Sequence, residues 1–398
     1  MATDWRVTAA SGSEVFDAFL YWPDNVEWST QLLRLFSYST LGAADFSEVE
    51  FVARSLPEGD EQAWHVGFGG LAYRLDERAS TALAGGHVAS ALAAFARACI
   101  YYRLAATFLS MRGETEVPFI EDSRRCFRAV LDLDEQVQSE TIEIPYGVQT
   151  LPAYVVAPVG RSEPAPSVIV LGGIDAFAEE MYFKIGRALV RKGFTVLLPD
   201  GPGQGESRRR RIPARYDYEV AISALVTYLS ERPEVDSRRI ALIGSSMGGY
   251  FAARGAAFEH RLCATVIWGA FYGIDAAHPP TVRNGTPFRL GQAMAMFAVS
   301  DPHQLAAAVE HFNLEGVAQR ITSPILILHG GSDVQVPLAH AQRLFEEVPH
   351  VDKQLIVYPP GQPGCTHCQL DSPLTAHFDI LGWLDTFLGS PQLQKERQ

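Results

Sequence analysis

The sequence predicts an α/β protein in which a helical N-terminal region precedes a mostly parallel sheet that carries helices on both faces. Three observations support this prediction. The first 135 or so residues show helical spacing of apolar residues and few strand signals. From about Glu140, short β-branched runs alternate with helical stretches, which is typical of a parallel sheet. The chain of 398 residues is also long enough for two or three folding units.

Four helices are expected in the helical region, for which we take residues 1–135. Over 25–40, apolar residues recur every three or four positions and form one stripe, namely Trp28, Leu32, Leu35 and Phe36. The other helices are expected over 61–84, 88–111 and 123–133. The helix over 88–111 is apolar, but Arg97 and Arg103 lie in its interior. A membrane makes such charges costly, so we expect a core helix in which each arginine has a partner.

The second region, residues 136–398, begins with a predicted antiparallel hairpin, because apolar and polar residues alternate on both sides of Gly147. Six further strands are expected where short β-branched runs stand between helical stretches. These runs cover 167–171, 195–199, 240–243, 264–268, 325–329 and 354–358.

Composition and charge exclude several functions. Lys and Arg total 33 and Asp and Glu total 46, so the formal net charge is −13. Such an acidic chain argues against binding to nucleic acid or to an anionic membrane. The five cysteines do not indicate a disulfide framework, and the N-terminus lacks the pattern of a signal peptide. We therefore expect a cytoplasmic protein that acts on a small molecule.

The clearest chemical motif is Gly-Ser-Ser-Met-Gly at 244–248, which follows an expected strand and precedes an expected helix. In this strand–turn–helix context, the pattern G-x-S-x-G places a serine hydroxyl on a sharp turn. The N-terminus of the following helix favours developing negative charge there. Ser246 is therefore the predicted nucleophile; the alternative is a chance glycine–serine turn.

A serine nucleophile needs a base and a carboxylate that orients the base. Asp333 follows the expected strand 325–329, and His367 ends the glycine- and proline-rich loop after 354–358. Because these loops lie at the C-terminal ends of neighbouring strands, we predict Asp333 as the acid and His367 as the base. The rival His377 falls inside the last expected helix, and His329 is a candidate for a supporting group.

Two backbone N–H groups are expected to bind the oxyanion that forms when the serine attacks. One belongs to Met247, the residue after the nucleophile. The other is assigned to Ile174, which follows the expected strand 167–171. Gly172 and Gly173 would let the backbone approach the substrate at that point.

Three further motifs are open to more than one interpretation. The loop 200–207 is rich in glycine, but the spacing does not fit a dinucleotide site, so no nucleotide is expected. The four arginines at 208–211 indicate either a solvated loop or a clamp for an anionic substrate or carrier-protein arm. Cys365 and Cys368 lie on a loop without a second cysteine pair, so we expect neither a metal nor a cofactor.

Taken together, these residues resemble a known family. The segment 244–248, Asp333 and His367 resemble the catalytic residues of the α/β-hydrolase fold. The N-terminal region and two core loops are similar to the FrsA-like group of that superfamily at Trp64, 86–91, 97–103, 123–127, 172–175 and 200–205. This group includes the pseudooxynicotine hydrolases and the fungal Yg1-type polyketide-shortening hydrolases. The resemblance implies an α/β-hydrolase domain with a helical cap, and a homodimer.

The resemblance also implies hydrolysis of a carbon–carbon bond next to a carbonyl, in a polyketide-like or aromatic β-dicarbonyl or ketone, through an acyl-enzyme. Some members use an extra acid after the sixth strand, where this chain has Asp275. We expect substrate contacts at Gly173, Asp175, Asp275 and Tyr102, and a pocket wall from the segment 270–320. The cap is expected to supply aromatic pocket residues, namely Trp64, Phe68, Tyr73, Tyr101, Tyr102 and Phe108.

Other functions fit the same residues. An ester hydrolase, a thioesterase or an acyltransferase needs the same nucleophile and base, but no acid that protonates carbon. A peptidase of the prolyl-oligopeptidase type and a non-catalytic binding protein are further alternatives.

Overall fold

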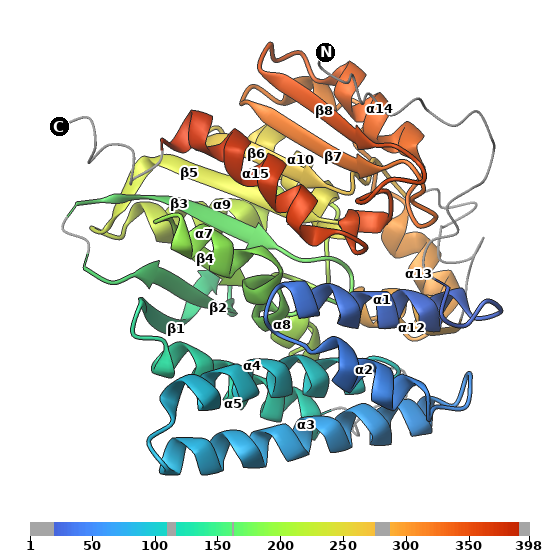
Figure 1. Ribbon diagram of the computed structural model, residues 1–398. Coiled ribbons are helices and arrows are strands. Elements are labelled where there is room, and N and C mark those ends of the chain that lie inside the picture. Colours follow the sequence, from blue (N-terminus) through green and yellow to red (C-terminus); the bar gives the residue numbers. More distant parts are fainter. Residues whose placement is uncertain (1–19, 110–116, 161–162, 275–286, 390–398) are drawn as a thin grey trace, which may run out of the picture.

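The computed structural model describes residues 20–109, 117–160, 163–274 and 287–389 (Figure 1). The predicted fold class is confirmed: an eight-stranded, mostly parallel sheet carries helices on both faces, and a helical region precedes it. In Figure 1 the helices α2 to α5 form a layer beneath the sheet, while α1 lies between that layer and the C-terminal part of the chain.

The described part of the helical region contains five helices: α1 (Val26–Thr40), α2 (Phe46–Ala53), α3 (Glu61–Ala84), α4 (Val88–Ala105) and α5 (Val117–Leu133). The side chains of Asn25, Asp45 and Asp60 accept hydrogen bonds from backbone N–H groups of α1, α2 and α3, respectively, and so fix where these helices begin. Helix α2 was not predicted, because eight residues are too few to show a helical period.

Helix α4 is the one helix of the described residues that is long and apolar enough to cross a membrane, and 67% of it is buried inside the fold. It packs against α3 and α5. Arg97 pairs with Glu48 of α2 at 3.2 Å, and Arg103 pairs with Glu180 of α6 (Ala178–Met181) at 3.0 Å. Both arginines therefore have the partners that the sequence predicts for a core helix.

The sheet begins with the predicted hairpin of β1 (Val137–Tyr146) and β2 (Gln149–Pro158), which pair antiparallel. All six further strands were predicted: β3 (Ala165–Leu171), β4 (Thr195–Pro199), β5 (Val235–Ser245), β6 (Leu262–Trp268), β7 (Ile325–Gly330) and β8 (Lys353–Tyr358). The spatial order is β1-β2-β4-β3-β5-β6-β7-β8. β2 pairs antiparallel with β4, and the remaining neighbours are parallel.

Two hydrophobic clusters cover the two faces of the sheet, because side chains alternate along each strand. Val168 and Val170 of β3 face one cluster, whereas Ile169 and Leu171 face the other. The first cluster contains α7 (Arg187–Arg191) and α15 (Pro373–Leu388) and continues into the helical region. The second contains α9 (Glu219–Ser230), α10 (Met247–Phe258) and α14 (Leu338–Glu347).

An ion-pair network joins the helical region to the segment after β3. Arg34 of α1 lies 2.6 Å from both Asp175 and Glu180. Arg124 of α5 lies 3.3 Å from Glu179. The side chains of Glu179 and Glu180 are 2% and 1% exposed, so these pairs are shielded from water. The network therefore fixes the position of the helical region over the C-terminal ends of the parallel strands.

Candidate active site

Ser246 lies on the turn between β5 and α10, as the motif predicts. Its backbone has φ 59° and ψ −120°, a strained conformation for a residue with a side chain. A Cβ on Gly244 would lie 1.9 Å from the carbonyl oxygen of Gly248, and a Cβ on Gly248 would lie 2.5 Å from that of Gly172. Glycine is therefore required at both positions of this tight turn.

His367 and Asp333 meet Ser246 at the C-terminal ends of the strands. Nε2 of His367 lies 2.9 Å from Oγ of Ser246, and Nδ1 lies 2.6 Å from Oδ2 of Asp333. Asp333 comes from the loop after β7, and His367 comes from the loop after β8. The structure thus brings the predicted nucleophile, base and acid into one hydrogen-bonded array.

The array is electrostatically coupled. Oδ1 of Asp333 accepts hydrogen bonds from the N–H groups of Gln335 (2.8 Å) and Val336 (2.9 Å), and its side chain is fully buried. Burial raises the pKa of Asp333, but His367 outweighs this effect and holds that pKa below its usual range. Burial lowers the pKa of His367, whereas the Asp333 carboxylate raises it, and the net pKa lies above the ordinary value. The pair therefore makes His367 a stronger base than a free histidine.

The two other histidines near the array have structural contacts. Nε2 of His377, in α15, lies 2.6 Å from the carbonyl oxygen of Lys184. Nε2 of His329, at the end of β7, lies 2.9 Å from the carbonyl oxygen of Val336 and 3.8 Å from Asp333. His329 thus supports the loop that carries Asp333, and His377 contacts a backbone carbonyl of the neighbouring helix.

The loop after β3 lies against Ser246. A Cβ on Gly173 would lie 3.2 Å from that of Ser246, and Ile174 lines the same cavity as Ser246 and Met247. Met247 is the first residue of α10, so the helix's own hydrogen bonds leave its N–H unused. The positions of Ile174 and Met247 are therefore compatible with the predicted oxyanion site.

The glycine-rich loop after β4 supports this arrangement. The side-chain amide of Gln204 donates to the carbonyl oxygens of Gly172 (2.5 Å) and Gly173 (3.0 Å), and Tyr218 donates to Gln204 (2.9 Å). Oδ1 and Oδ2 of Asp200 accept from the N–H groups of Ala178 and Glu206. Because these side chains hold neighbouring backbone, the loop has a structural role.

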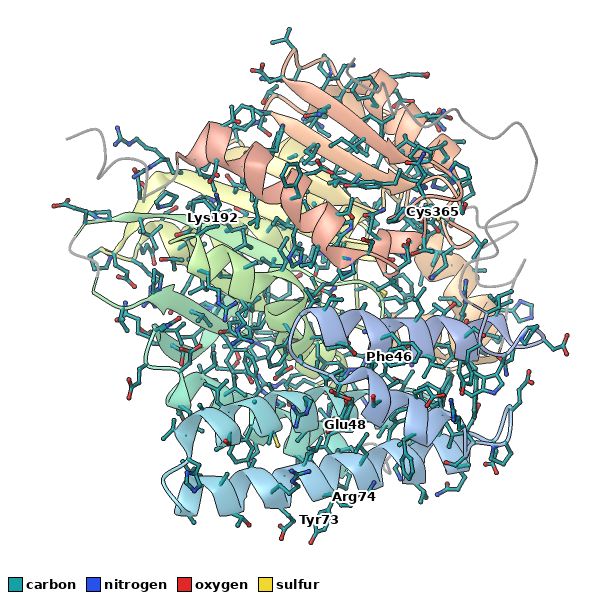
Figure 2. All side chains as sticks on the ribbon, in the orientation of Figure 1. Phe46, Glu48, Tyr73, Arg74, Lys192 and Cys365 are labelled. Atoms are coloured by element: carbon teal, nitrogen blue, oxygen red, sulfur yellow. The ribbon has the colours of Figure 1, made fainter. Side chains whose placement is uncertain are left out.

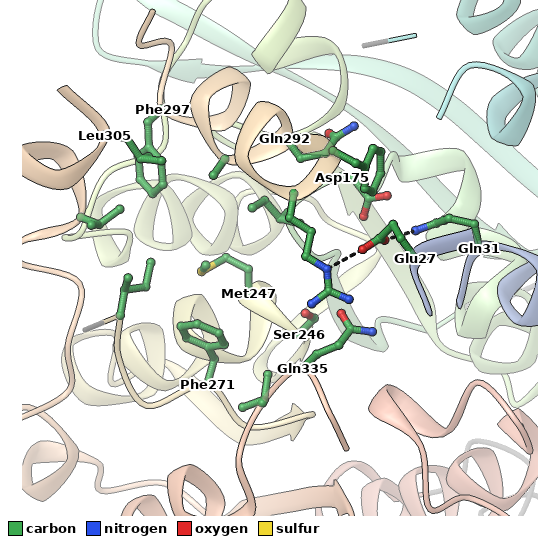
Figure 3. Close-up of a pocket in the computed structure, with 17 residues that line it drawn as sticks. Glu27, Gln31, Asp175, Ser246, Met247, Phe271, Gln292, Phe297, Leu305 and Gln335 are labelled. Carbon is green, nitrogen blue, oxygen red and sulfur yellow. Dashed lines mark hydrogen bonds and ion pairs between the residues drawn. The ribbon is translucent and has the colours of Figure 1, made fainter. Parts of the chain in front are cut away.

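A large cavity opens on one side of Ser246 (Figure 3). It holds about 890 Å³ of space not filled by atoms, part of it open to solvent. Figure 3 shows Ser246 and Met247 beside Phe271, with Phe297 and Leu305 on one side and Glu27 and Gln31 on the other. We call it the apolar chamber, after its walls of Phe271, Ile274, Phe288, Ala293, Phe297, Leu305 and Val309.

Most of these walls come from the segment that the sequence predicts to line the pocket, residues 270–320. Two helices of that segment, α12 (Pro287–Met296) and α13 (Pro302–Val309), contribute side chains. Nε of Arg289 in α12 lies 2.6 Å from Oε2 of Glu27 in α1, and both residues line the chamber. The helical region therefore contributes to the pocket through α1.

A second cavity is also lined by Ser246 and holds about 790 Å³ of unfilled space. We call it the polar chamber after the charged side chains of Arg34, Glu180 and Lys184 in its walls; apolar side chains, among them Leu41, Met181 and Leu370, line it as well. Both chambers are lined by Gln31, Ile174, Asp175, Ser246 and Gln335. Ser246 thus stands where the two chambers meet.

The four predicted substrate contacts have different outcomes. Gly173 and Asp175 line the polar chamber, but the Asp175 carboxylate is held by Arg34 and Arg103. Tyr102 is a correction: its side chain is buried, its hydroxyl donates to Asp76 at 3.2 Å, and it lines neither chamber. Asp275 lies outside the described residues.

The expected aromatic pocket residues of the cap also need correction. Trp64, Phe68 and Phe108 pack against one another in the interior of the helical region, and Tyr101 donates to Glu48. Tyr73 is 58% exposed and points outward from α3 beside Arg74, away from the sheet (Figure 2). Helical spacing identified these residues as apolar, but an aromatic residue of a helix belongs more often to a core than to a pocket.

Three of the four arginines at 208–211 have partners within the fold, so these three do not indicate a substrate clamp. Arg208 and Arg209 belong to α8 (Gly205–Arg209), and Arg208 donates to Gln292 of α12 at 2.7 Å. Arg209 pairs with Glu206 and Arg210 with Glu143, both at 2.8 Å. These contacts stabilise the fold around the apolar chamber.

The two cysteines beside the base are free thiols. Cys365 and Cys368 are buried, and the Cys368 sulfur lies 3.5 Å from Nε2 of His367 and 3.4 Å from Oγ of Ser245. Among the described residues, no group of three or more His, Cys, Asp or Glu side chains is placed to hold a metal ion.

Sequence reasoning did not find Gln31, Lys184, Ser245, Arg289 or Gln335 as residues of the site. Ser245 and Gln335 stand one and two positions from predicted catalytic residues, so proximity in the chain was an available signal. Gln31, Lys184 and Arg289 lie on helices remote from the motifs, and only the packing of those helices brings them to Ser246.

The fold and the array at Ser246 define an α/β-hydrolase. Residues 151–368, more than half of the chain, match the dienelactone hydrolase family, and the chain belongs to that family. The resemblance expected from the sequence is therefore confirmed, and the protein is a hydrolase.

The similarity to individual proteins extends through the helical region. The 2,6-dihydropseudooxynicotine hydrolase of Paenarthrobacter nicotinovorans is 28% identical, over 90% of this chain and 91% of its own. Hydrolyase poxO of Penicillium oxalicum is 27% identical, over 81% of this chain and 87% of its own. The crystal structure of a 2,6-dihydroxy-pseudo-oxynicotine hydrolase superposes with a TM-score of 0.76 at 25% identity, covering 89% of this chain and 96% of that one.

Proposed function

We propose that this protein hydrolyses a carbon–carbon bond next to a carbonyl group, in an aromatic or polyketide-like β-dicarbonyl compound or ketone, through an acyl-enzyme on Ser246. The observation that carries the proposal is the hydrogen-bonded array of Ser246, His367 and Asp333 where the two chambers meet. In this proposal Ser246 is the nucleophile, His367 is the base, and Asp333 orients His367.

The reaction would begin when Oγ of Ser246 attacks the ketone carbon and its proton passes to Nε2 of His367. The resulting imidazolium would be stabilised by Asp333, because the carboxylate lies 2.6 Å from Nδ1. The N–H groups of Met247 and Ile174 would bind the oxyanion. Cleavage of the carbon–carbon bond would leave an acyl group on Ser246 and release an enolate, and water activated by His367 would then free the acid.

The preference for carbon–carbon cleavage is supported by the pseudooxynicotine hydrolase named above, because the similarity to it includes the helical region and not only the catalytic core. In this chain that region supplies Gln31 to both chambers. The similarity thus extends to the part of the chain that lines both chambers through Gln31.

An ester hydrolase, thioesterase or acyltransferase is the second candidate. The specific observation in its favour is the family, which is named for the hydrolysis of a dienelactone, and a lactone is a cyclic ester. The same nucleophile and base would serve, but the alcohol or thiol that leaves needs no stabilised carbanion.

One substrate tests both candidates. An aryl β-diketone that also bears an acetate ester is incubated with the protein, and the products are identified by mass spectrometry. Release of the acyl side chain as a carboxylic acid supports carbon–carbon hydrolysis, whereas release of acetate alone would move the protein to the esterases.

Two variants control this experiment. Ser246→Ala should abolish product formation and labelling by a serine-directed phosphonate. Ser139→Ala removes an exposed hydroxyl on β1 and should leave both unchanged. Wild-type protein that the phosphonate does not label would contradict the role of Ser246 in either candidate function.

A further inference from the structure

The polar chamber contains positive charge that the fold does not neutralise. This charge is not that of Arg34, which is paired with Asp175 and Glu180, each at 2.6 Å. Lys184 of η3 (Tyr182–Gly186) lines the same chamber. Within residues 20–109, 117–160, 163–274 and 287–389, no carboxylate lies within ion-pairing distance of Lys184. A largely buried ammonium group without a counter-ion is costly, which indicates a site for a negatively charged ligand atom.

Two contacts hold the ammonium group of Lys184 beside the nucleophile. Its Nζ donates to Oγ of Ser245 at 2.7 Å, and Ser245 directly precedes Ser246. The same Nζ lies 4.4 Å from the centre of the Trp268 ring, at the end of β6. Both contacts fix the position of the ammonium group, and neither neutralises its charge.

The reaction proposed above produces negative charge on both halves of the substrate. The oxyanion on the attacked carbon is expected at the N–H groups of Met247 and Ile174. The enolate oxygen of the leaving half needs a second stabilising group, and the apolar chamber offers a wall of hydrophobic side chains to the acyl half. Lys184 lines the polar chamber and not the apolar one, so the leaving half is assigned to the polar chamber.

We propose that the polar chamber binds the leaving half of the substrate and that Lys184 is a catalytic residue whose ammonium group binds the developing enolate oxygen. The inference rests on the proposed carbon–carbon hydrolysis and names the class of leaving group, an oxygen-stabilised carbanion such as an enolate or phenolate. An alkyl ester would not need this residue, because its alcohol leaves with the proton that His367 took from Ser246.

The chemical balance requires no additional reactant. The electron pair of the broken carbon–carbon bond moves onto the enolate, with its charge on the oxygen at Lys184. The proton that His367 took from Ser246 then moves to the carbon of the enolate and gives a ketone. Water supplies a proton to His367 and a hydroxide to the acyl group, so one diketone and one water yield one carboxylic acid and one ketone.

The electrostatics of Lys184 are consistent with this role. Burial lowers the pKa of the ammonium group below its ordinary value, although Cys368 acts in the opposite direction. An anionic oxygen that enters the chamber would therefore interact strongly with this ammonium group, because little solvent screens the attraction there. A dry, preorganised charge of this kind stabilises a transition state more than the same charge in water.

The first test compares two substrates that share the same aryl acyl group, a β-diketone and an ethyl ester, whose alcohol does not leave as a stabilised anion. Lys184→Gln removes the charge and retains a donor for Ser245. We expect kcat for the diketone to fall about 10²- to 10³-fold, with the ester within about threefold of wild type. Ethylammonium should partly restore diketone cleavage in Lys184→Ala. Lys192→Gln, a change at a partly exposed lysine paired with Asp385, should affect neither substrate.

An equal loss on both substrates would overturn the proposal, because it would mean that Lys184 only positions the serine turn. No loss on either substrate would overturn it as well. The proposed function itself is tested by the wild-type protein. If wild type cleaved the ester and not the diketone, the proposed function would be wrong, whatever the role of Lys184.

A binding measurement tests the site without turnover. In the Ser246→Ala background at pH 8, 4-nitrophenolate is titrated and its absorbance and heat of binding are followed. We expect Lys184→Gln to weaken binding of the phenolate by about tenfold or more, with no effect on neutral nitrobenzene. Equal affinity of the phenolate for both proteins would contradict an anion site at Lys184. Thermal unfolding of each variant verifies that it is folded.

Discussion

Arg34 of α1 and Asp175 of the loop after β3 are 141 positions apart in the chain, and their side chains meet at 2.6 Å. Asp175 directly follows Ile174, whose N–H is a proposed oxyanion donor. Through this contact the helical region holds the backbone segment that carries the proposed oxyanion donor. The network continues to Glu180, which is buried and also pairs with Arg103.

Removal of Arg34 should destabilise the whole protein. Arg34→Met removes one of the two arginines that pair with Asp175 and Glu180 in a buried site, and the loss of one partner of such an ion pair costs about 3–5 kcal/mol. Chemical denaturation measures the free energy of unfolding. Arg54→Met breaks an exposed pair with Glu50 and should cost less than about 1 kcal/mol. If the two variants lost similar amounts of unfolding free energy, the buried network would stabilise the protein no more than an exposed ion pair does.

The same network predicts how wild-type stability responds to acid. Burial raises the pKa of Asp175, but Arg34 and Arg103 lower it to about 2, below its ordinary value of 3.8. A lowered carboxyl pKa gives stability that is complete above the unfolded-state value and is lost as pH falls through the folded-state value. We therefore expect the contribution of Asp175 to vanish between about pH 4 and pH 2. Chemical denaturation at several pH values should show that the free energy of unfolding falls more steeply with decreasing pH in wild type than in Asp175→Asn.

Asp333→Asn should reduce kcat by about 10⁴-fold, because an amide cannot hold His367 in the tautomer that accepts the serine proton. The remaining activity should also have a different pH dependence. The carboxylate raises the pKa of His367, so the acid limb of kcat/KM in wild type should lie above pH 6.5, the ordinary histidine value, and should move down in the variant. Asp352→Asn, an exposed change before β8, is the matched control. If the acid limb of kcat/KM did not shift in Asp333→Asn, Asp333 would not be the group that raises the pKa of His367.

Filling the apolar chamber should change the choice of acyl group. Ala293 of α12 is buried and lines this chamber, so Ala293→Phe should occupy the space meant for a large acyl group. We expect kcat/KM for a benzoyl ester to fall about tenfold or more, with an acetyl ester nearly unchanged. Ala307→Phe adds the same ring to an exposed position of α13. If both esters lost activity equally in Ala293→Phe, the chamber would not be the acyl site.

The serine turn should not tolerate a methyl group. A Cβ at Gly248 would lie 2.5 Å from the carbonyl oxygen of Gly172, so Gly248→Ala should displace the loop after β3 and abolish activity. Gly382→Ala provides the contrast, because that glycine lies in α15 with open space around it. The second variant should stabilise the protein by about 1 kcal/mol, measured by chemical denaturation. An active Gly248→Ala protein would show that the turn is less constrained than its geometry indicates.

The sequence allowed the sheet to be predicted well, because fully buried strands appear as short β-branched runs. The bounds of β4 agree with the prediction at both ends. β5 begins at Val235, five residues before the predicted start, because its first part contains Asp236, Arg238 and Arg239 and has no apolar signal. The array was also predictable, since Ser246, Asp333 and His367 each stand at the end of a strand.

The substrate side of the site was much less predictable. Tyr102 has the helical spacing of an apolar residue, but only the packing of α4 against α3 and α5 decides that it faces Asp76 and not Ser246. Lys184 lies in no motif, and its place beside Ser245 depends on the short helix η3 turning its ammonium group toward β5. Contacts between helices and strand ends are tertiary, and one sequence carries little information about them.

The buried arginines also constrain the order in which the nascent chain can reach its final structure. Arg34, Arg103 and Arg124 leave the ribosome before the carboxylates of Asp175, Glu179 and Glu180 that neutralise them. The N-terminal helices cannot close their polar interior until the chain has been synthesised past residue 180 and β3 is available. Co-translational folding of this protein therefore has to wait for its middle third, and a chain truncated before Glu179 should remain open to proteases and chaperones.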